Sequence, residues 1–68
     1  SMGEPRLTER ERQILHLVAA GQTDREIGQT LNIAERTVRY TLRNLYDKLG
    51  VSSRAEAAYR ASQLGDNY

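Results

Sequence analysis

The residues best suited to chemistry in this chain are three arginines, Arg36, Arg39 and Arg43, within the stretch AERTVRYTLRNL. A guanidinium group is planar and permanently charged. It can bond either the O6 and N7 edge of guanine or the oxygens of a phosphate group. The only acid in that stretch is Glu35. This concentration of positive charge therefore indicates a surface that meets a polyanion.

Charge is polarised along the chain, although the net charge is only +1 over 68 residues. Residues 1–35 carry six acidic and four basic side chains, whereas residues 36–54 carry five basic side chains and one acidic one. An asymmetric distribution of this kind indicates nucleic-acid binding more strongly than the net charge does.

The composition argues against several other classes of protein. The chain has no cysteine and one histidine, His16, so we expect no disulfide framework, no metal and no cofactor. No pattern of nucleophile and base indicates an enzyme, and His16 is expected at the surface. No apolar run approaches the roughly 20 residues that a membrane-spanning helix needs. We therefore expect a cytoplasmic binding module without a membrane partner.

Helix-capping signals divide the chain into four helices. A Ser or Thr followed three residues later by Glu forms a capping box, and this pattern occurs at Thr8, Thr23 and Ser53. The expected helices run from these caps to about Ala20, Leu31 and Leu64, and a further helix spans 35–49. That helix would begin after Ala34, which cannot accept a capping bond and should cost about 1 kcal/mol relative to Ser.

The helix at 35–49 has two distinct faces. Its apolar residues recur at intervals of four, three and four, as in a buried stripe: Val38, Leu42, Leu45 and Leu49. At about 100° per residue, the opposite face presents Arg36, Arg39, Tyr40 and Arg43. A short helix, a tight turn and a helix of this kind are typical of helix-turn-helix proteins. On charge and periodicity alone, an ordinary solvated helix face is the alternative.

The fold class expected is therefore all-α, a four-helix helix-turn-helix domain without winged elements. We place the domain at residues 7–65, with a disordered tail, tag remnant or linker at 1–6 and a short tail at 66–68.

Spaced motifs over nearly the whole domain resemble one known family. They comprise Leu7-Thr8 with Glu9-Arg10-Glu11, Gly21, Glu26-Ile27, Leu31, Ile33, Thr37-Val38-Arg39, Lys48-Leu49-Gly50-Val51, Arg54 and Ala57. This pattern is similar to the LuxR/FixJ-type (GerE-like) helix-turn-helix, a DNA-binding domain found at the C-terminus of many bacterial transcription regulators.

The resemblance implies sequence-specific binding of double-stranded DNA, with the helix at 35–49 in the major groove. It implies base contacts from Arg36, Arg39, Tyr40 and Arg43. It implies phosphate contacts from Thr23, Asp24, Arg25, Thr37, Lys48, Ser52 and Arg54. It further implies a homodimer on DNA through the fourth helix, whose outward residues are expected to be Ala55, Tyr59 and Ser62.

The same resemblance implies further partners for a transcription regulator of this kind. The family usually carries an upstream receiver domain, as in response regulators, or a ligand-sensing domain, and neither is present in these residues. RNA polymerase is a further partner that it suggests.

Four residues depart from the family pattern, and one of them is Thr41, which stands where His is frequent. Asp24 stands where Asn is more frequent, and a carboxylate there would repel phosphate, so it is expected instead to cap the helix or stabilise its dipole. Gly28 replaces the usual Ala, at a cost of up to about 1 kcal/mol in helix propensity. Ala34 replaces the usual Ser and so removes a cap.

Two other functions compete with this interpretation. The promoter-reading domain of a sigma factor has three similar helices, but it normally ends near the recognition helix, whereas KLGVSSRAEAA predicts a fourth helix here. The second alternative is a helical protein-interaction module whose basic face meets an acidic protein. A salt titration with duplex DNA separates DNA binding from that alternative, because counterion release makes DNA affinity fall steeply with salt.

Overall fold

The fold is known from a computed structural model that describes residues 6–65, with side chains as far as Gln63. Four helices follow one another: α1 (Glu9–Ala19), α2 (Asp24–Leu31), α3 (Glu35–Leu49) and α4 (Arg54–Gly65). No strand occurs between residues 6 and 65, so the all-α prediction is confirmed. Apart from Arg6, the tails expected at 1–6 and 66–68 lie outside the described residues.

Local hydrogen bonds explain where α1, α2 and α3 begin and end. Thr8 and Thr23 each form a complete capping box with the glutamate three residues later, as predicted. Ala34 provides no side-chain cap for α3, also as predicted. Left-handed residues end two of the helices, Asn32 with a φ of 58° and Gly50 with a φ of 69°. Such conformations suit Asn and Gly best.

The start of α4 differs from the predicted capping box. The Ser53 hydroxyl does accept a bond from the Glu56 amide, at 3.1 Å. The Glu56 carboxylate, however, turns to Ser52, whose amide and hydroxyl donate to it at 3.1 and 2.9 Å. These two bonds lower the pKa of Glu56. The reciprocal half of the box is therefore made one residue earlier than the sequence pattern indicates.

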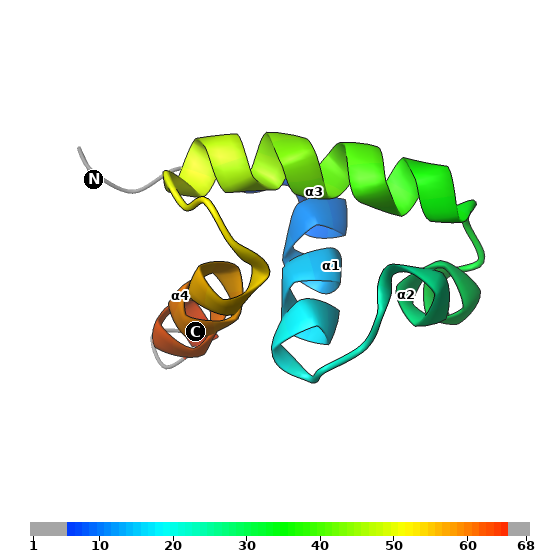
Figure 1. Ribbon diagram of the computed structural model, residues 1–68, viewed down its shortest axis with the longest axis horizontal. Helices are drawn as coiled ribbons and strands as arrows, with labels where there is room; N and C mark the ends of the chain where they lie inside the picture. The colour runs from blue at the N-terminus through cyan, green and yellow to red at the C-terminus, as the bar shows by residue number, and fades with distance from the viewer. Residues whose placement is uncertain (1–5, 66–68) are drawn as a thin grey trace.

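Helix α3 lies along one side of the molecule, and the other three helices lie on its other side (Figure 1). Helix α1 packs against each of the others and forms the centre of the fold. The largest fully buried side chains are Ile14, Ile27, Val38 and Leu45. They come from α1, α2 and α3, so the core holds α3 by its apolar stripe and leaves its other face outward.

The turn between α2 and α3 is packed against Gly28. A Cβ atom built on Gly28 would lie 2.8 Å from the Ile33 carbonyl oxygen, which is a backbone atom and cannot swing aside. The Gly28 carbonyl also accepts a 2.9 Å bond from the Ile33 amide. The missing side chain thus does more than lower helix propensity, because it lets the turn close onto α2.

Replacing Gly28 with valine should destabilise the domain by about 1–3 kcal/mol, since the added atoms overpack the turn. Urea unfolding followed by far-UV circular dichroism measures the effect. The matched control is Gln29→Val, which puts the same side chain on the adjacent, exposed residue of α2. Equal unfolding midpoints for the two variants would contradict the close packing inferred here.

None of the helices within residues 6–65 combines the length and the apolar character that crossing a bilayer requires.

Candidate nucleic-acid interface

The outward side of α3 carries a cluster of basic and aromatic side chains, which we call the arginine face: Arg36, Arg39, Tyr40 and Arg43. All four residues are exposed, and Tyr40 is 67% exposed. They lie opposite the apolar stripe of α3, every member of which is buried, namely Val38, Leu42, Leu45 and Leu49. The two faces predicted for this helix are therefore confirmed, and the arginine face is free of packing by α1, α2 and α4.

Arg39, in the arginine face, forms an ion pair within α3. Its Nη1 donates to Glu35 Oε2 at 2.9 Å, one helical turn earlier, and the two side chains are 58% and 47% exposed. An exposed pair of this kind contributes about 0–1 kcal/mol. The guanidinium group can therefore leave Glu35 for another acceptor, such as a guanine edge, at little cost to folding.

A shallow hollow of about 510 Å³ runs beside the arginine face. Arg39 and Arg43 line it from α3, and Ser52 lines it from the loop that leads to α4. Asp24, at the start of α2, also lines it. The start of α2 is thus brought next to the arginines, an arrangement that a helix-turn-helix needs for backbone and base contacts to be made together.

The start of α2 presents several of the residues expected to contact phosphate. Thr23 and Arg25 are exposed. The Thr23 hydroxyl oxygen accepts a 3.1 Å hydrogen bond from the Glu26 amide, so the hydroxyl hydrogen remains available to donate. Thr37, in the first turn of α3, is exposed as well. These three side chains are therefore accessible from solvent.

Arg54 and Asp24, two of the other expected phosphate contacts, are bound to each other. Arg54 Nη1 donates to Asp24 Oδ1 at 2.7 Å, and Nη2 donates to the Gln22 carbonyl oxygen at 2.7 Å. Asp24 therefore neither caps α2 nor stands alone as an acid. It pairs with an arginine from α4, 30 residues away in sequence.

Lys48 and Ser52 also have acidic partners within the domain. Lys48 Nζ lies 2.7 Å from Glu11 Oε1, and its side chain is 39% exposed. The Ser52 amide and hydroxyl bond Glu56. Phosphate would have to compete with these carboxylates, so both residues are weaker candidates than Thr23, Arg25 and Thr37.

The Glu11–Lys48 pair ties the start of α1 to the end of α3. Glu11 is buried, which raises the pKa of its carboxyl, but hydrogen bonds from Lys48 and Thr8 outweigh burial and leave the pKa below its ordinary value of 4.5. A lowered pKa means that the folded state favours the ionised carboxylate. Its stabilisation is complete above the ordinary pKa and is lost as the pH falls through the lowered one.

We expect Glu11→Gln to lower the free energy of unfolding by about 1 kcal/mol at neutral pH, because the amide keeps the geometry but not the charge. The difference from the wild type should shrink as the pH falls below the ordinary carboxyl pKa of 4.5 and through the lowered pKa of Glu11, where Glu11 itself becomes protonated. Urea unfolding at a series of pH values measures it. The control Glu9→Gln changes an exposed residue nearby, and its free energy of unfolding should differ from that of the wild type by a nearly constant amount. A Glu11→Gln difference that does not change with pH would contradict the pairing.

The outward side of α4 carries the residues expected at a dimer interface. Ala55, Tyr59 and Ser62 are all exposed, and Tyr59 is 64% exposed. The Tyr59 hydroxyl accepts a 3.0 Å bond from Gln63 on the next turn of the helix. The opposite side of α4 buries Ala57 completely against the core. One face of α4 is therefore used by the fold and the other is open.

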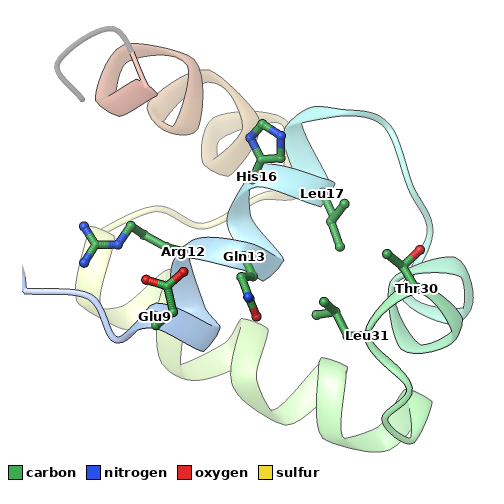
Figure 2. A pocket seen from close by; sticks show the side chains of 7 residues that line it. All are labelled: Glu9, Arg12, Gln13, His16, Leu17, Thr30 and Leu31. Atoms are coloured by element: carbon green, nitrogen blue, oxygen red, sulfur yellow. The ribbon is translucent and has the colours of Figure 1, made fainter.

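A second hollow, of about 330 Å³, lies between α1 and α2 and has no residue from α3 in its lining. Figure 2 shows Leu17 of α1 and Leu31 of α2 pointing toward one another across it, with His16 directly before Leu17 on α1. His16 is exposed, as predicted. This hollow is separate from the arginine face and brings none of its residues into the interface.

Residues 6–65 contain no group of three His, Cys, Asp or Glu side chains that could hold a metal ion.

Comparison with known proteins agrees with this geometry. Residues 5–61 match the family described as "Bacterial regulatory proteins, luxR family". The chain belongs to the LuxR family. This LuxR-family domain is a helix-turn-helix DNA-binding domain of a transcription regulator. Its fold is similar to that of "Structure of Transcription factor, GerE", with a TM-score of 0.77 and 41% identity over 87% of this chain and 88% of that one.

Two relatives that are much longer than this chain match it over most of its length. It is 53% identical over 51 residues to the probable transcriptional regulatory protein SgaR of Hyphomicrobium methylovorum. It is 43% identical over 58 residues to the HTH-type transcriptional regulator MalT of Klebsiella pneumoniae. These matches cover 75% and 85% of this chain, but only 24% of SgaR and 6% of MalT. The chain thus spans a small part of either relative.

Sequence reasoning missed the long-range partners of the basic residues in this LuxR-family domain. Besides Lys48 and Arg54, Arg60 donates from Nη1 to the Leu49 carbonyl at 3.0 Å and so satisfies the end of α3. Partners separated by 11 to 37 residues leave no periodic signal. A charge count can only register that the acids and bases are present in similar numbers.

Proposed function

We propose that this domain binds double-stranded DNA sequence-specifically, with the arginine face of α3 in the major groove. The observation that carries the proposal is the exposure of Arg36, Arg39, Tyr40 and Arg43 on one side of a helix whose other side is buried. Arginine bonds guanine edges through two donors, and Tyr40 can touch a thymine methyl group or bond a phosphate. The domain acts by binding, not by catalysis.

The start of α2 and the first turn of α3 supply the backbone contacts in this proposal. Thr23, Arg25 and Thr37 donate to phosphates and so set the position of α3 in the groove. Free amides at the start of α2 add to that attraction. Lys48 and Ser52 take part only if phosphate displaces their carboxylate partners.

Binding of a duplex across a range of salt concentrations tests the proposal. The logarithm of the affinity should fall linearly with the logarithm of the salt concentration, by about 0.9 for each phosphate neutralised. Selection from random duplexes should then enrich one sequence. A domain that ignores duplex DNA at low salt would refute DNA binding, and equal recovery of all sequences would refute specific readout.

We further propose that two copies pair on DNA through the outward face of α4. Ala55 and Ser62 are small enough for a second helix to approach closely, and Tyr59 provides an aromatic anchor between them. Each half of a two-fold duplex site would then receive one α3, with half-sites about one helical turn apart.

Tyr59→Glu should abolish cooperative binding to a duplex with two half-sites, because it puts a charge at the centre of the pairing surface. Affinity for a single half-site should change little, since Tyr59 lies on α4 and not on the arginine face. Band-shift titrations of both duplexes measure this. Unaltered cooperativity in the variant would rule out the α4 interface.

The setting follows from the same proposal. The domain works in the bacterial cytoplasm as the DNA-binding part of a longer regulator, such as a response regulator, whose sensing part lies outside these residues. RNA polymerase is the expected further partner at the promoter. Restoring the sensing part and measuring DNA affinity with and without its signal would test this arrangement.

A further inference from the structure

The Asp24–Arg54 ion pair puts a negative charge at the edge of the arginine face. The Asp24 side chain is 22% exposed and that of Arg54 is 41% exposed, so the pair is only partly screened by water. Its two hydrogen bonds from Arg54, to Asp24 and to the Gln22 carbonyl, both measure 2.7 Å. One guanidinium group is thus held in a fixed position and electrically neutralised.

Arg54 links two helices that are otherwise apart. Within the described residues, α2 and α4 do not pack against each other. Arg54 begins α4, while Asp24 begins α2 and Gln22 lies two residues earlier, in the connecting loop. Arg54 is therefore a positioning residue that holds the start of α2 against the start of α4.

Asp24 lines the hollow beside the arginine face and also a third hollow, at the start of α2. One is lined also by Arg39 and Arg43, and the other also by Arg25 and Arg54. A phosphate drawn toward any of these arginines comes near the Asp24 carboxylate. Like charges a few ångströms apart repel strongly wherever water screens them incompletely.

We propose that Asp24 is an affinity-limiting residue of the DNA interface, one that weakens attraction to the phosphate backbone while leaving base readout by α3 unchanged. The inference rests on the proposed function. Its carboxylate acts in two ways, because it neutralises Arg54 and it borders the hollow that Arg39 and Arg43 line. Phosphate contacts carry no sequence information, so the limit applies to every duplex alike.

Asp24→Asn isolates the charge. The amide oxygen can still accept the bond from Arg54, and the Gln22 carbonyl is untouched, so the link between α2 and α4 is retained. Fluorescence anisotropy measures the binding of each variant to a scrambled duplex of about 20 base pairs at several salt concentrations. We expect affinity to rise about three- to tenfold at low salt, with a salt slope steeper by about 0.9.

Glu9→Gln is the matched control, since it changes the net charge by the same amount on the side of α1 that lines the separate hollow of Figure 2. It should leave affinity within about twofold of the wild type. Asp24→Glu keeps the charge and should show no gain. If the Asp24→Asn domain binds no more tightly than the wild type, or if Glu9→Gln gains as much, the proposal is overturned.

Arg54→Met removes the bond between Arg54 and Asp24, so the effect of the Asp24 charge can be measured without it. Asp24→Asn added to that variant should still raise affinity, because the carboxylate is then uncompensated. No gain in the double variant would mean that Asp24 acts only by holding Arg54, which also overturns the proposal. Thermal unfolding confirms that each variant is folded. A wild type that binds no duplex at low salt would instead defeat the proposed function itself.

Discussion

Arg39→Ala should lose about 1–3 kcal/mol of discrimination at a single base position, roughly a 5- to 150-fold change in preference. Arg39 lies in the middle of the arginine face, and its side chain is 58% exposed. The loss arises because alanine cannot make the paired bonds that a guanidinium group forms with guanine. Competition between duplexes that differ at one position measures it.

Stability should change little in this variant. The Glu35–Arg39 pair is exposed on both sides, and such pairs contribute about 0–1 kcal/mol to folding. An altered preference can therefore be assigned to the interface and not to unfolding. A melting curve of each variant serves as the check.

Two further variants sharpen the test of Arg39. Arg39→Lys keeps the charge but not the planar fork, so it should lose the preference while keeping the salt slope. Arg12→Ala removes an arginine from α1 at the hollow of Figure 2 and should affect neither. An unchanged preferred sequence in Arg39→Ala would remove this residue from base readout.

Leu45→Ala should destabilise the domain by about 2–5 kcal/mol, the largest effect on folding that we expect from a single side chain. Leu45 is completely buried in the stripe that holds α3 to the core. Removing its side chain both loses apolar burial and leaves a cavity. This loss is a large part of the total stability of about 5–15 kcal/mol that is typical of folded domains. A domain this small has a thin core and little stability to spare, so we expect a substantial unfolded population.

Urea unfolding monitored by far-UV circular dichroism measures this loss. Tyr40→Ala is the matched control on the same helix, since Tyr40 is 67% exposed and should contribute little to folding. The two variants should separate the faces of α3, Leu45→Ala acting on stability and Tyr40→Ala on DNA binding. An unfolding midpoint unchanged by Leu45→Ala would contradict the core described above.

The turn at Gly28 shows how local reasoning can identify a residue and miss its role. Helix propensity alone predicts that glycine weakens α2. In the folded domain, the place that a Cβ atom would take is 2.8 Å from the Ile33 carbonyl. The cost in propensity is real, but that contact forms only when the turn brings Ile33 back over α2.

The sequence by itself determined the four helices, the capping boxes of α1 and α2, and the two faces of α3. These features depend on residues within four positions of one another, at a period of 3.6, so they can be read without a fold. Thr8 and Thr23 each begin a helix with a complete capping box, as the pattern indicates. The exposure of the arginine face follows from the same periodicity.

Only the tertiary structure decided which basic side chains are free and which are already bound. Lys48 pairs with Glu11 across 37 residues, and Arg54 pairs with Asp24 across 30. Local sequence patterns do not predict which acid pairs with a given lysine or arginine, because the pairing depends on how the four helices pack around one core. Electrostatic interactions act through space, so the chain must fold before its charges have partners.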